Sequence, residues 1–374
     1  MNYSINPKLS LDKIAIIVCL FPWVSFGILD MDTQPYSLIF ILLALVYRGK
    51  FLKLDMTINA SLILIIIGFI ISIFRTENLI NFQSFRYIYG ILLFVFSLIF
   101  FNDYISRKGL PLKTIKNANI VYLLVSVLEL LTPSLVAGLT PSRTELSRGL
   151  TSLTPEPSYF ATFLFFCSFI YWISSNYKFK KDMYFHFANL IFIVLFAKSS
   201  IGLLLILISF FLYQISNIKI SKLLIIILFS ILLVSYLPQI IDFIVPSSRI
   251  SNVVSQIFKI GINEIFYIDA SFNQRLDHIV TSIHASLNNF LIPSGIDSFT
   301  VERNEILPYY EGYFWYAGET NIIMSWIGLM IFHLGLFFLL AFGLILFKIK
   351  NNPQDIIAFL IFITILMTPI PAGF

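Results

Sequence analysis

The chain has 374 residues; 58% are apolar, 17% aromatic and only 12% Asp, Glu, Lys or Arg, with a formal net charge of +5 and a mean hydropathy of +0.88. Globular domains carry about twice this share of charged residues, and disordered chains are still more polar, so both classes are excluded. Cys19 and Cys167 lie inside apolar runs, which excludes a disulfide scaffold. The apolar runs are continuous, whereas barrel strands alternate. The composition therefore predicts a polytopic helical membrane protein.

Runs of about 20 mostly apolar residues predict helices that cross a membrane. We count eleven such runs and expect ten to twelve spans in an all-α fold, a single membrane domain over residues 1–374. Some of these runs are short, so the sequence predicts that a span is present there better than it predicts where the span begins and ends. The predicted spans are 14–29, 35–47, 58–74, 85–101, 118–138, 157–174, 184–198, 200–216, 222–245, 318–347 and 355–370.

The loop charges predict an orientation. If the N-terminus is cytoplasmic, the inner segments contain 16 of the 25 Lys and Arg residues but only 5 of the 20 Asp and Glu residues. Every inner loop then carries at least two cations, which is the pattern of cytoplasmic loops. The positive net charge therefore reports orientation and does not indicate nucleic-acid binding. Because the long polar loops lie on the outer side, we expect the functional face to be the outer one, toward the periplasm or the cell exterior.

The first long outer loop, 133–157, contains two cations, Arg143 and Arg148, and ends at Glu156 and Pro157. Arginine binds phosphate in a bidentate manner, so the pair predicts an anion site. The alternative interpretation is that the two arginine side chains reach toward lipid headgroups. Glu156 is alternatively a cap of the helix that Pro157 begins.

The turn at Lys198 joins two apolar runs with almost no loop. The preceding run, 184–198, covers only about 22 Å at 1.5 Å per residue, less than the hydrocarbon core. Lys198 is therefore expected to face an anion or a polar cavity, or else to reach up to the headgroups. Glu129 and Asp242 also place charged side chains in the outer halves of apolar runs, so they too are expected either to face a polar environment inside the protein or to reach the headgroups.

A larger outer loop, 246–317, contains Arg249 and an amphipathic pattern over 272–288. Arg275 and His278 are three residues apart on the polar face of this predicted helix. The simpler interpretation is a helix on the outer leaflet whose polar face is solvated. A second, weaker pattern covers 250–260.

Aromatic and acidic residues alternate near the end of this loop, around Tyr313. Aromatic rings cover the C–H faces of sugars and carboxylates accept from sugar hydroxyls, so the stretch is consistent with a sugar-binding wall. A belt of aromatic residues at headgroup depth explains it equally well.

Several chemistries lack their motifs. The sequence has no phosphate-binding Walker motif, no dinucleotide glycine fingerprint and no Gly-x-Ser-x-Gly elbow. The four histidines have no metal-site spacing, so we expect neither a metal nor another cofactor.

Seven short motifs follow one another between about 130 and 335. They are Arg148-Gly149, Glu156-Pro157-Ser158-Tyr159-Phe160-Ala161, Phe196 to Gly202, Arg275, Asn288-Asn289, Gly295 to Phe299, and Glu319-Thr320-Asn321. Together they resemble the O-antigen polymerase family, within the wider O-antigen ligase and polymerase superfamily, while the N-terminal spans match only as generic membrane helices. Two positions depart from the family pattern, with Lys198 where Arg is frequent and Glu319 where many members, ligases especially, have His. The resemblance implies the inner membrane of a bacterium, with the functional face in the periplasm.

The resemblance implies a metal-independent glycosyltransferase that polymerises oligosaccharide repeat units carried on undecaprenyl diphosphate into O-antigen or capsular polysaccharide. Membrane lipids, a chain-length regulator and a flippase are the implied partners. Arg148 and Arg275 would contact the diphosphate and Glu156 would orient an arginine or accept the hydroxyl proton. Supporting or substrate-binding roles would fall to Arg143, Lys198, Arg249, His278, Tyr313, Glu319 and Asn321.

Two other functions stay open at this point. A ligase of the same superfamily would move finished glycan to an acceptor. A polysaccharide flippase or other transporter would show internal repeats and paired charges near mid-membrane. We find no such repeat, and the polar residues gather in long outer loops.

Overall fold

The computed structural model describes residues 7–25, 34–48, 55–79, 82–140, 149–178, 182–217, 270–310, 312–315, 322–347 and 353–366, with five single positions between 236 and 259. Every regular element in these residues is helical, which confirms the all-α class. The helices are α1 (Pro7–Leu20), α2 (Tyr36–Arg48), α3 (Met56–Phe74), α4 (Phe82–Lys108), α5 (Leu112–Leu131), α6 (Pro133–Val136), α7 (Pro157–Ser174), α8 (Met183–Ile191), η3 (Phe192–Phe196), α9 (Ser200–Asn217), α13 (Ala270–Asn288), α14 (Phe299–Ile306), η5 (Leu307–Tyr310), α15 (Trp326–Leu346) and α16 (Pro353–Leu366).

Five of the described helices, α3, α4, α5, α7 and α15, are long and apolar enough to cross a membrane. Shorter apolar helices are α2, α9, α16 and the continuous stretch Met183–Phe196. Their apolar character is compatible with a membrane protein, but the expected count of about eleven spans is not confirmed. The predicted span 222–245 lies outside the described residues, apart from two single positions.

Proline explains where the helix ends differ from the predicted spans. The run 14–29 is wrong in both bounds, because α1 begins at Pro7 and ends two residues before Pro22. The run 118–138 is displaced in the same way, since α5 ends at Leu131 before Pro133. Proline suits a first helical turn and cannot continue a helix.

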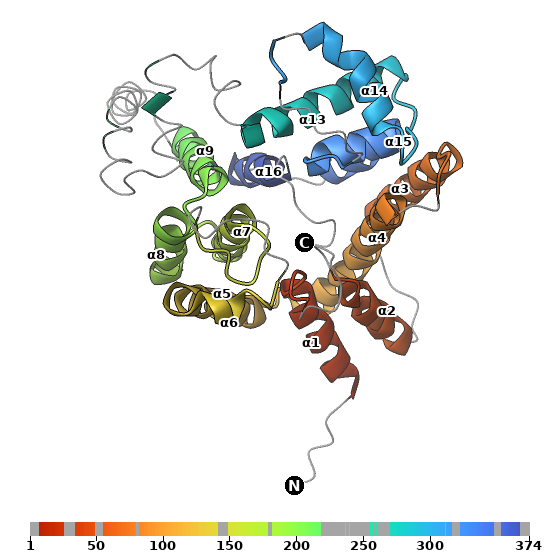
Figure 1. The fold of residues 1–374 in the computed structure, drawn as a ribbon. Helices are drawn as coiled ribbons and strands as arrows, with labels where there is room; N and C mark the ends of the chain where they lie inside the picture. Colours follow the sequence, from red (N-terminus) through yellow and green to blue (C-terminus); the bar gives the residue numbers. More distant parts are fainter. Residues whose placement is uncertain are drawn as a thin grey trace.

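The helices pack into a bundle with three main apolar cores (Figure 1). One core joins α5, α7, α9 and α16 with the end of α1 through residues such as Trp23 and Phe163. A second core joins α3, α4 and α15. A Cβ atom built on Gly68 of α3 would lie 3.1 Å from the Cβ of Phe337 on α15, so the two helices pack closely there. The third joins α1, α2 and α4.

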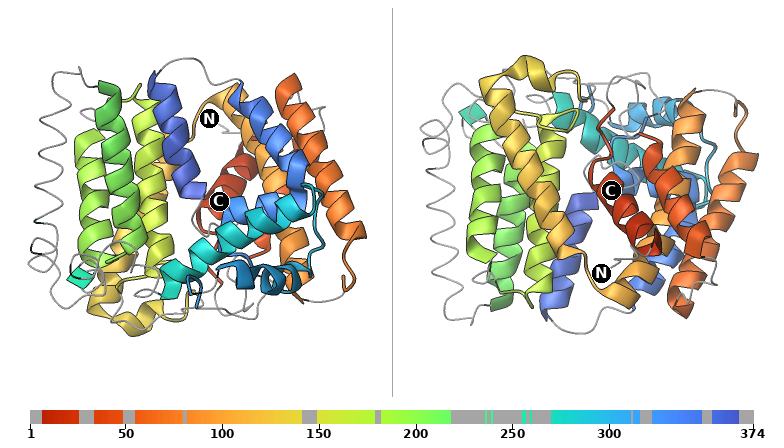
Figure 2. Two further views of the ribbon diagram at one scale, coloured as in Figure 1. Left: turned by 90° about the horizontal axis from the view of Figure 1, so that it is seen from above. Right: turned by 90° about the horizontal axis from the view of Figure 1, so that it is seen from below.

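The two ends of the bundle differ in chemistry. One end holds a buried cluster in which Arg48 pairs with Asp12 and Asp103, and Lys108 pairs with Asp12 at 2.8 Å. The opposite end holds α6, the start of α7 and α14 (Figure 2). The C-terminal ends of α2 and α4, which border two of the predicted inner segments, therefore lie opposite α6 and the start of α7, which belong to the first predicted outer loop.

α15 is bent at Gly335, where φ is 55° and ψ is −132°. The bend is sharp enough that the rings of Trp326 and Phe338, twelve residues apart, lie 5.7 Å from each other. Leu291 contacts the bend, since its carbonyl accepts from Leu336 N at 2.8 Å. The first half of α15 thus lies beside α13, which crosses the long helices obliquely (Figure 2, left).

Candidate functional site

The segment 149–156, which follows Arg148 in the chain, is held by one carboxylate. Glu129, near the end of α5, is 4% exposed and accepts from Thr151 N and Ser152 N at 3.0 and 2.6 Å. The hydroxyl of Thr151 donates to the same carboxylate at 2.9 Å. Because backbone N–H groups must find acceptors when buried, Glu129 replaces the water that would otherwise bind this loop.

The same segment contacts the turn that contains Lys198. Leu150 N donates to Phe196 O at 2.9 Å, and a Cβ on Gly149 would overlap the carbonyl of Ala197. Two motifs almost fifty residues apart in the sequence are therefore in backbone contact. Gly149 has a φ of 126°, a conformation that L side chains rarely adopt, so glycine is required here for two reasons.

Lys198 sits in a strained turn at the base of a π-helical segment. The φ of Lys198 is 47°, and η3 ends at Phe196, two residues before it. π-Helical turns and left-handed residues are frequent at functional sites because the surrounding structure must maintain them. The side chain is half-buried and forms no ion pair with the described residues.

Glu156 occupies the N-cap position of α7, and Pro157 is the first helical residue, as the sequence predicts. Its side chain does not cap the helix backbone. Its Oε2 instead accepts from Ser158 Oγ at 3.0 Å, and the residue is half-buried. The alternative of a simple capping role therefore fits the position of Glu156 but not its hydrogen bonding.

Five of the expected site residues, Arg143, Arg148, Arg249, Glu319 and Asn321, lie outside the described residues.

The amphipathic helix predicted over 272–288 is present as α13, but its orientation is the reverse of the solvated interpretation. Six polar side chains of α13 are completely buried, whereas Ile283 is 37% and Leu287 59% exposed. The polar face of α13 packs against α14 and α15, where hydrogen-bond partners offset the cost of burying polar groups. The buried polar residues are Asn273, Asp277, His278, Thr281, Ser282 and Ser286.

A buried ion pair joins α13 to α14. Asp277 and Arg303 are 0% and 1% exposed, and Arg303 Nε donates to Asp277 Oδ2 at 2.8 Å. Burial raises the pKa of the Asp277 carboxyl, and the hydrogen bonds from Arg303 offset part of this effect. Sequence reasoning missed this pair. The sequence signal for a buried polar face was the spacing of polar residues in α13, such as Asp277, Thr281 and Ser282, which recur at helical intervals as the apolar residues do.

His278 lies at the contact of α13 with the residues just before α15. Its Nδ1 accepts from Met324 N at 2.9 Å, and a backbone N–H can only donate, so the proton of this neutral ring is on Nε2. Burial, together with Arg303, lowers the pKa of His278 to about 3. A fully buried ring whose acceptor nitrogen is occupied is suited to holding the 322–325 segment rather than to taking a proton from a substrate.

Arg275 is half-buried on α13, two residues before the buried Asp277. Tyr313 is 54% exposed, and its carbonyl accepts from Asn273 Nδ2 at 2.7 Å. The aromatic stretch is therefore attached to the start of α13 at Asn273, two residues before Arg275. Tyr309 and Trp315, 75% and 48% exposed, present rings on the same stretch.

The motif from Asn289 to Phe299 has structural contacts. Asn289 Nδ2 and Ser298 Oγ donate to Glu302 at 2.7 and 2.8 Å. Asp297 accepts from Asn78 N at 2.9 Å, and Gly295 packs against the backbone of Arg75. These residues attach the segment to the end of α3.

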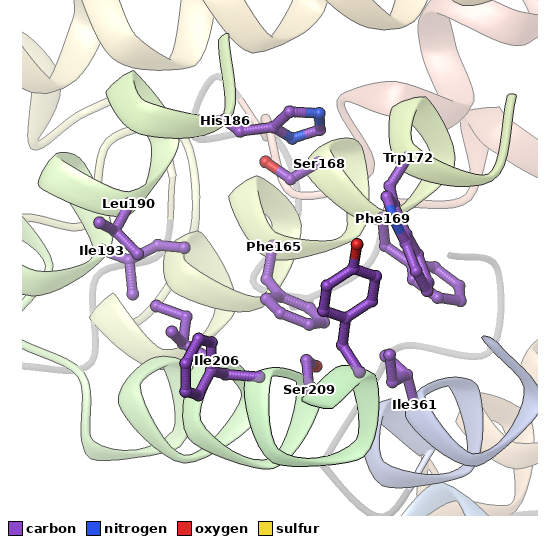
Figure 3. A pocket seen from close by; sticks show the side chains of 12 residues that line it. Phe165, Ser168, Phe169, Trp172, His186, Leu190, Ile193, Ile206, Ser209 and Ile361 are labelled. Atoms are coloured by element: carbon purple, nitrogen blue, oxygen red, sulfur yellow. The ribbon is translucent and has the colours of Figure 1, made fainter. Parts of the chain in front are cut away.

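A pocket of about 200 Å³ lies between α7, α8, α9 and α16 (Figure 3). Its walls are mainly apolar and aromatic, with polar groups from Ser168, His186 and Ser209. None of the expected site residues lines it. Among the described residues, no group of three His, Cys, Asp or Glu side chains could hold a metal ion.

No protein-family model, no curated protein and no solved structure matches this chain.

Proposed function

We propose that this chain is a glycosyltransferase that polymerises lipid-diphosphate-linked oligosaccharide repeat units into O-antigen or capsular polysaccharide at the outer face of a bacterial inner membrane. The observation that carries the proposal is the contact of Gly149 with Ala197. It joins the glycine of the Arg-Gly element, part of the most specific motif of the resemblance, to the turn that contains Lys198.

The chemistry would need charge stabilisation rather than a cofactor. The acceptor hydroxyl attacks the anomeric carbon of the donor, the bond to the diphosphate breaks, and the diphosphate leaves with the bonding electrons. Cations near the leaving oxygens stabilise the charge that develops there. Lys198, beside the Gly149 contact, and Arg275 on α13 are the described residues that we assign to this role.

The acceptor hydroxyl must lose a proton as the new bond forms. Glu156 is our candidate for this group, because its carboxylate is half-buried and is held by Ser158 Oγ rather than by the helix backbone. His278 is less suited, since its acceptor nitrogen already binds Met324 N.

A hydrocarbon chain on the substrate requires apolar surface within the bundle. The aromatic pocket between α7, α8 and α9 offers such a surface (Figure 3). Burying each methylene contributes about 0.8 kcal/mol, so even part of a long chain would contribute much of the binding free energy.

The test is the surface polysaccharide of a deletion strain on a gel. A missing polymerase leaves glycan capped by one repeat unit, and the wild-type gene restores the ladder. A missing ligase leaves polymer on its lipid carrier instead. A missing flippase leaves no capped lipid at the outer face, so each alternative predicts a different gel.

A further inference from the structure

Glu129 is the one acidic residue of α5, and it lies in the mainly apolar second half of that helix. α5 is one of the five helices long and apolar enough to span a membrane, and Glu129 is 4% exposed near its end. Both carboxylate oxygens accept hydrogen bonds, Oε1 from Thr151 Oγ1 and Oε2 from Ser152 N, while Thr151 N lies 3.0–3.1 Å from both. Burying a carboxylate is costly unless such donors compensate it.

The partners of Glu129 all belong to one short loop. Ser152 has a φ of 54°, and its hydroxyl donates to Tyr122 O, which lies about two turns before Glu129 on α5. Thr154 Oγ1 lies 2.7 Å from Thr151 O and 2.8 Å from Glu156 O, and it shares its single hydrogen between these two carbonyls. The contacts of Glu129 thus extend through Thr151 and Thr154 to the backbone of Glu156.

We propose that Glu129 is a positioning residue that fixes the 149–156 segment against α5 and the Ala197 turn. Its role in catalysis rests on the proposed function, whereas its effect on the loop does not. A carboxylate accepts from all three neighbouring groups through two charged oxygens. An amide keeps one neutral oxygen for the two buried backbone N–H groups, so it replaces charge-assisted hydrogen bonds with weaker ones.

The loop is tested by thiol labelling. A cysteine introduced by Leu153→Cys replaces a side chain that is 6% exposed, and the native Cys19 and Cys167 are buried. In the otherwise wild-type chain a membrane-impermeant maleimide should label this thiol slowly. Adding Glu129→Gln should raise the rate roughly tenfold or more, the factor expected when even one hydrogen bond to a charged group is lost. Labelling of the parent chain without Leu153→Cys gives the background.

Matched variants separate the effect of Glu129 on the 149–156 segment from a general loss of folded structure. Glu302→Gln removes a carboxylate that holds a different loop through Asn289 and Ser298, and it should leave labelling at position 153 unchanged. Glu129→Asp keeps the charge on a shorter side chain and should give an intermediate rate. Unchanged labelling in Glu129→Gln would overturn the proposal.

The catalytic consequence is read from the polysaccharide ladder at matched protein levels. Glu129→Gln should abolish the ladder, and Glu129→Asp should restore part of it. Faster labelling with a complete ladder would overturn the positioning role. If the wild-type chain restores no ladder in the deletion strain, the proposed function fails, and the labelling rates alone still decide whether Glu129 fixes the loop.

Discussion

Gly149 and Ala197 are in direct backbone contact: a Cβ atom at position 149 would overlap the carbonyl oxygen of Ala197, and the next residue, Leu150, donates to Phe196 O at 2.9 Å. The contact joins the connection before α7 to the turn before α9. No side chain other than hydrogen fits there without displacement of one of these backbones.

Gly149→Ala should therefore destabilise the protein by about 2 kcal/mol or more, because alanine is strained at a φ of 126° and also collides with Ala197. Thermal unfolding in detergent measures the change. Gly138→Ala is the matched control, since nothing lies within 4 Å of a Cβ at that position. Equal melting temperatures for the two variants would contradict the contact.

The bend of α15 gives a second prediction. A Cβ on Gly335 would overlap the carbonyl of Leu291, and the φ of 55° again disfavours other residues. Gly335→Ala should straighten or displace α15 and separate it from α13, with a large fall in melting temperature. Gly343→Ala, in the second half of the same helix and free of neighbours within 4 Å, should have little effect. The idea fails if both substitutions are tolerated alike.

The buried pair of Asp277 and Arg303 gives a third prediction. Asp277→Asn leaves a buried guanidinium without its carboxylate, which costs about 3–5 kcal/mol. Replacing both residues, with Asp277→Leu and Arg303→Met, should recover much of this loss. Arg107→Gln is the control, because Arg107 is 44% exposed and exposed pairs contribute little. A stable Asp277→Asn variant would show that the pair does not hold α14 to α13.

His278 predicts a pH dependence of stability. Its pKa is about 3 in the folded chain, below the ordinary value of 6.5, so the unfolded chain binds a proton that the folded chain excludes. Its contribution is fully present above pH 6.5 and falls by about 1.4 kcal/mol per unit as the pH drops toward 3. His278→Asn keeps an acceptor for Met324 N but cannot titrate, so its melting temperature should vary less between pH 7.5 and pH 5. His284→Asn controls for the loss of a histidine, and identical slopes in all three proteins would contradict the assignment.

The helical class and many element positions could be predicted from the sequence, because apolar runs report burial in lipid or protein directly. The run 157–174 matches α7 in both bounds, and the pattern over 272–288 matches α13. Helix ends before Pro22 and Pro133 were missed because the apolar runs continue through them. The bend at Gly335 was missed for a related reason, since a glycine does not interrupt an apolar pattern.

The candidate site was less predictable, because its contacts are between residues far apart in sequence. Glu129 and Thr151 are 22 residues apart and Asp277 and Arg303 are 26 apart. Hydropathy identified the amphipathic helix but not which face would be buried, since the partners of the polar face lie on α14 and α15, farther along the chain. The three-residue spacing of Arg275 and His278 predicted that the two lie on one face of the helix. Spacing could not show that His278 is fully buried while Arg275 is only half-buried.

We propose that this chain joins repeat units at a site that includes Arg275. The measurement that decides this is the surface polysaccharide ladder of a deletion strain complemented with wild type, Arg275→Ala or Arg107→Ala at equal protein levels. Arg107 lies at the opposite end of the bundle and is a matched control. We expect wild type and Arg107→Ala to restore the ladder and Arg275→Ala to leave glycan capped by one repeat unit. A complete ladder from Arg275→Ala, or an unchanged ladder in the deletion strain, would contradict the claim.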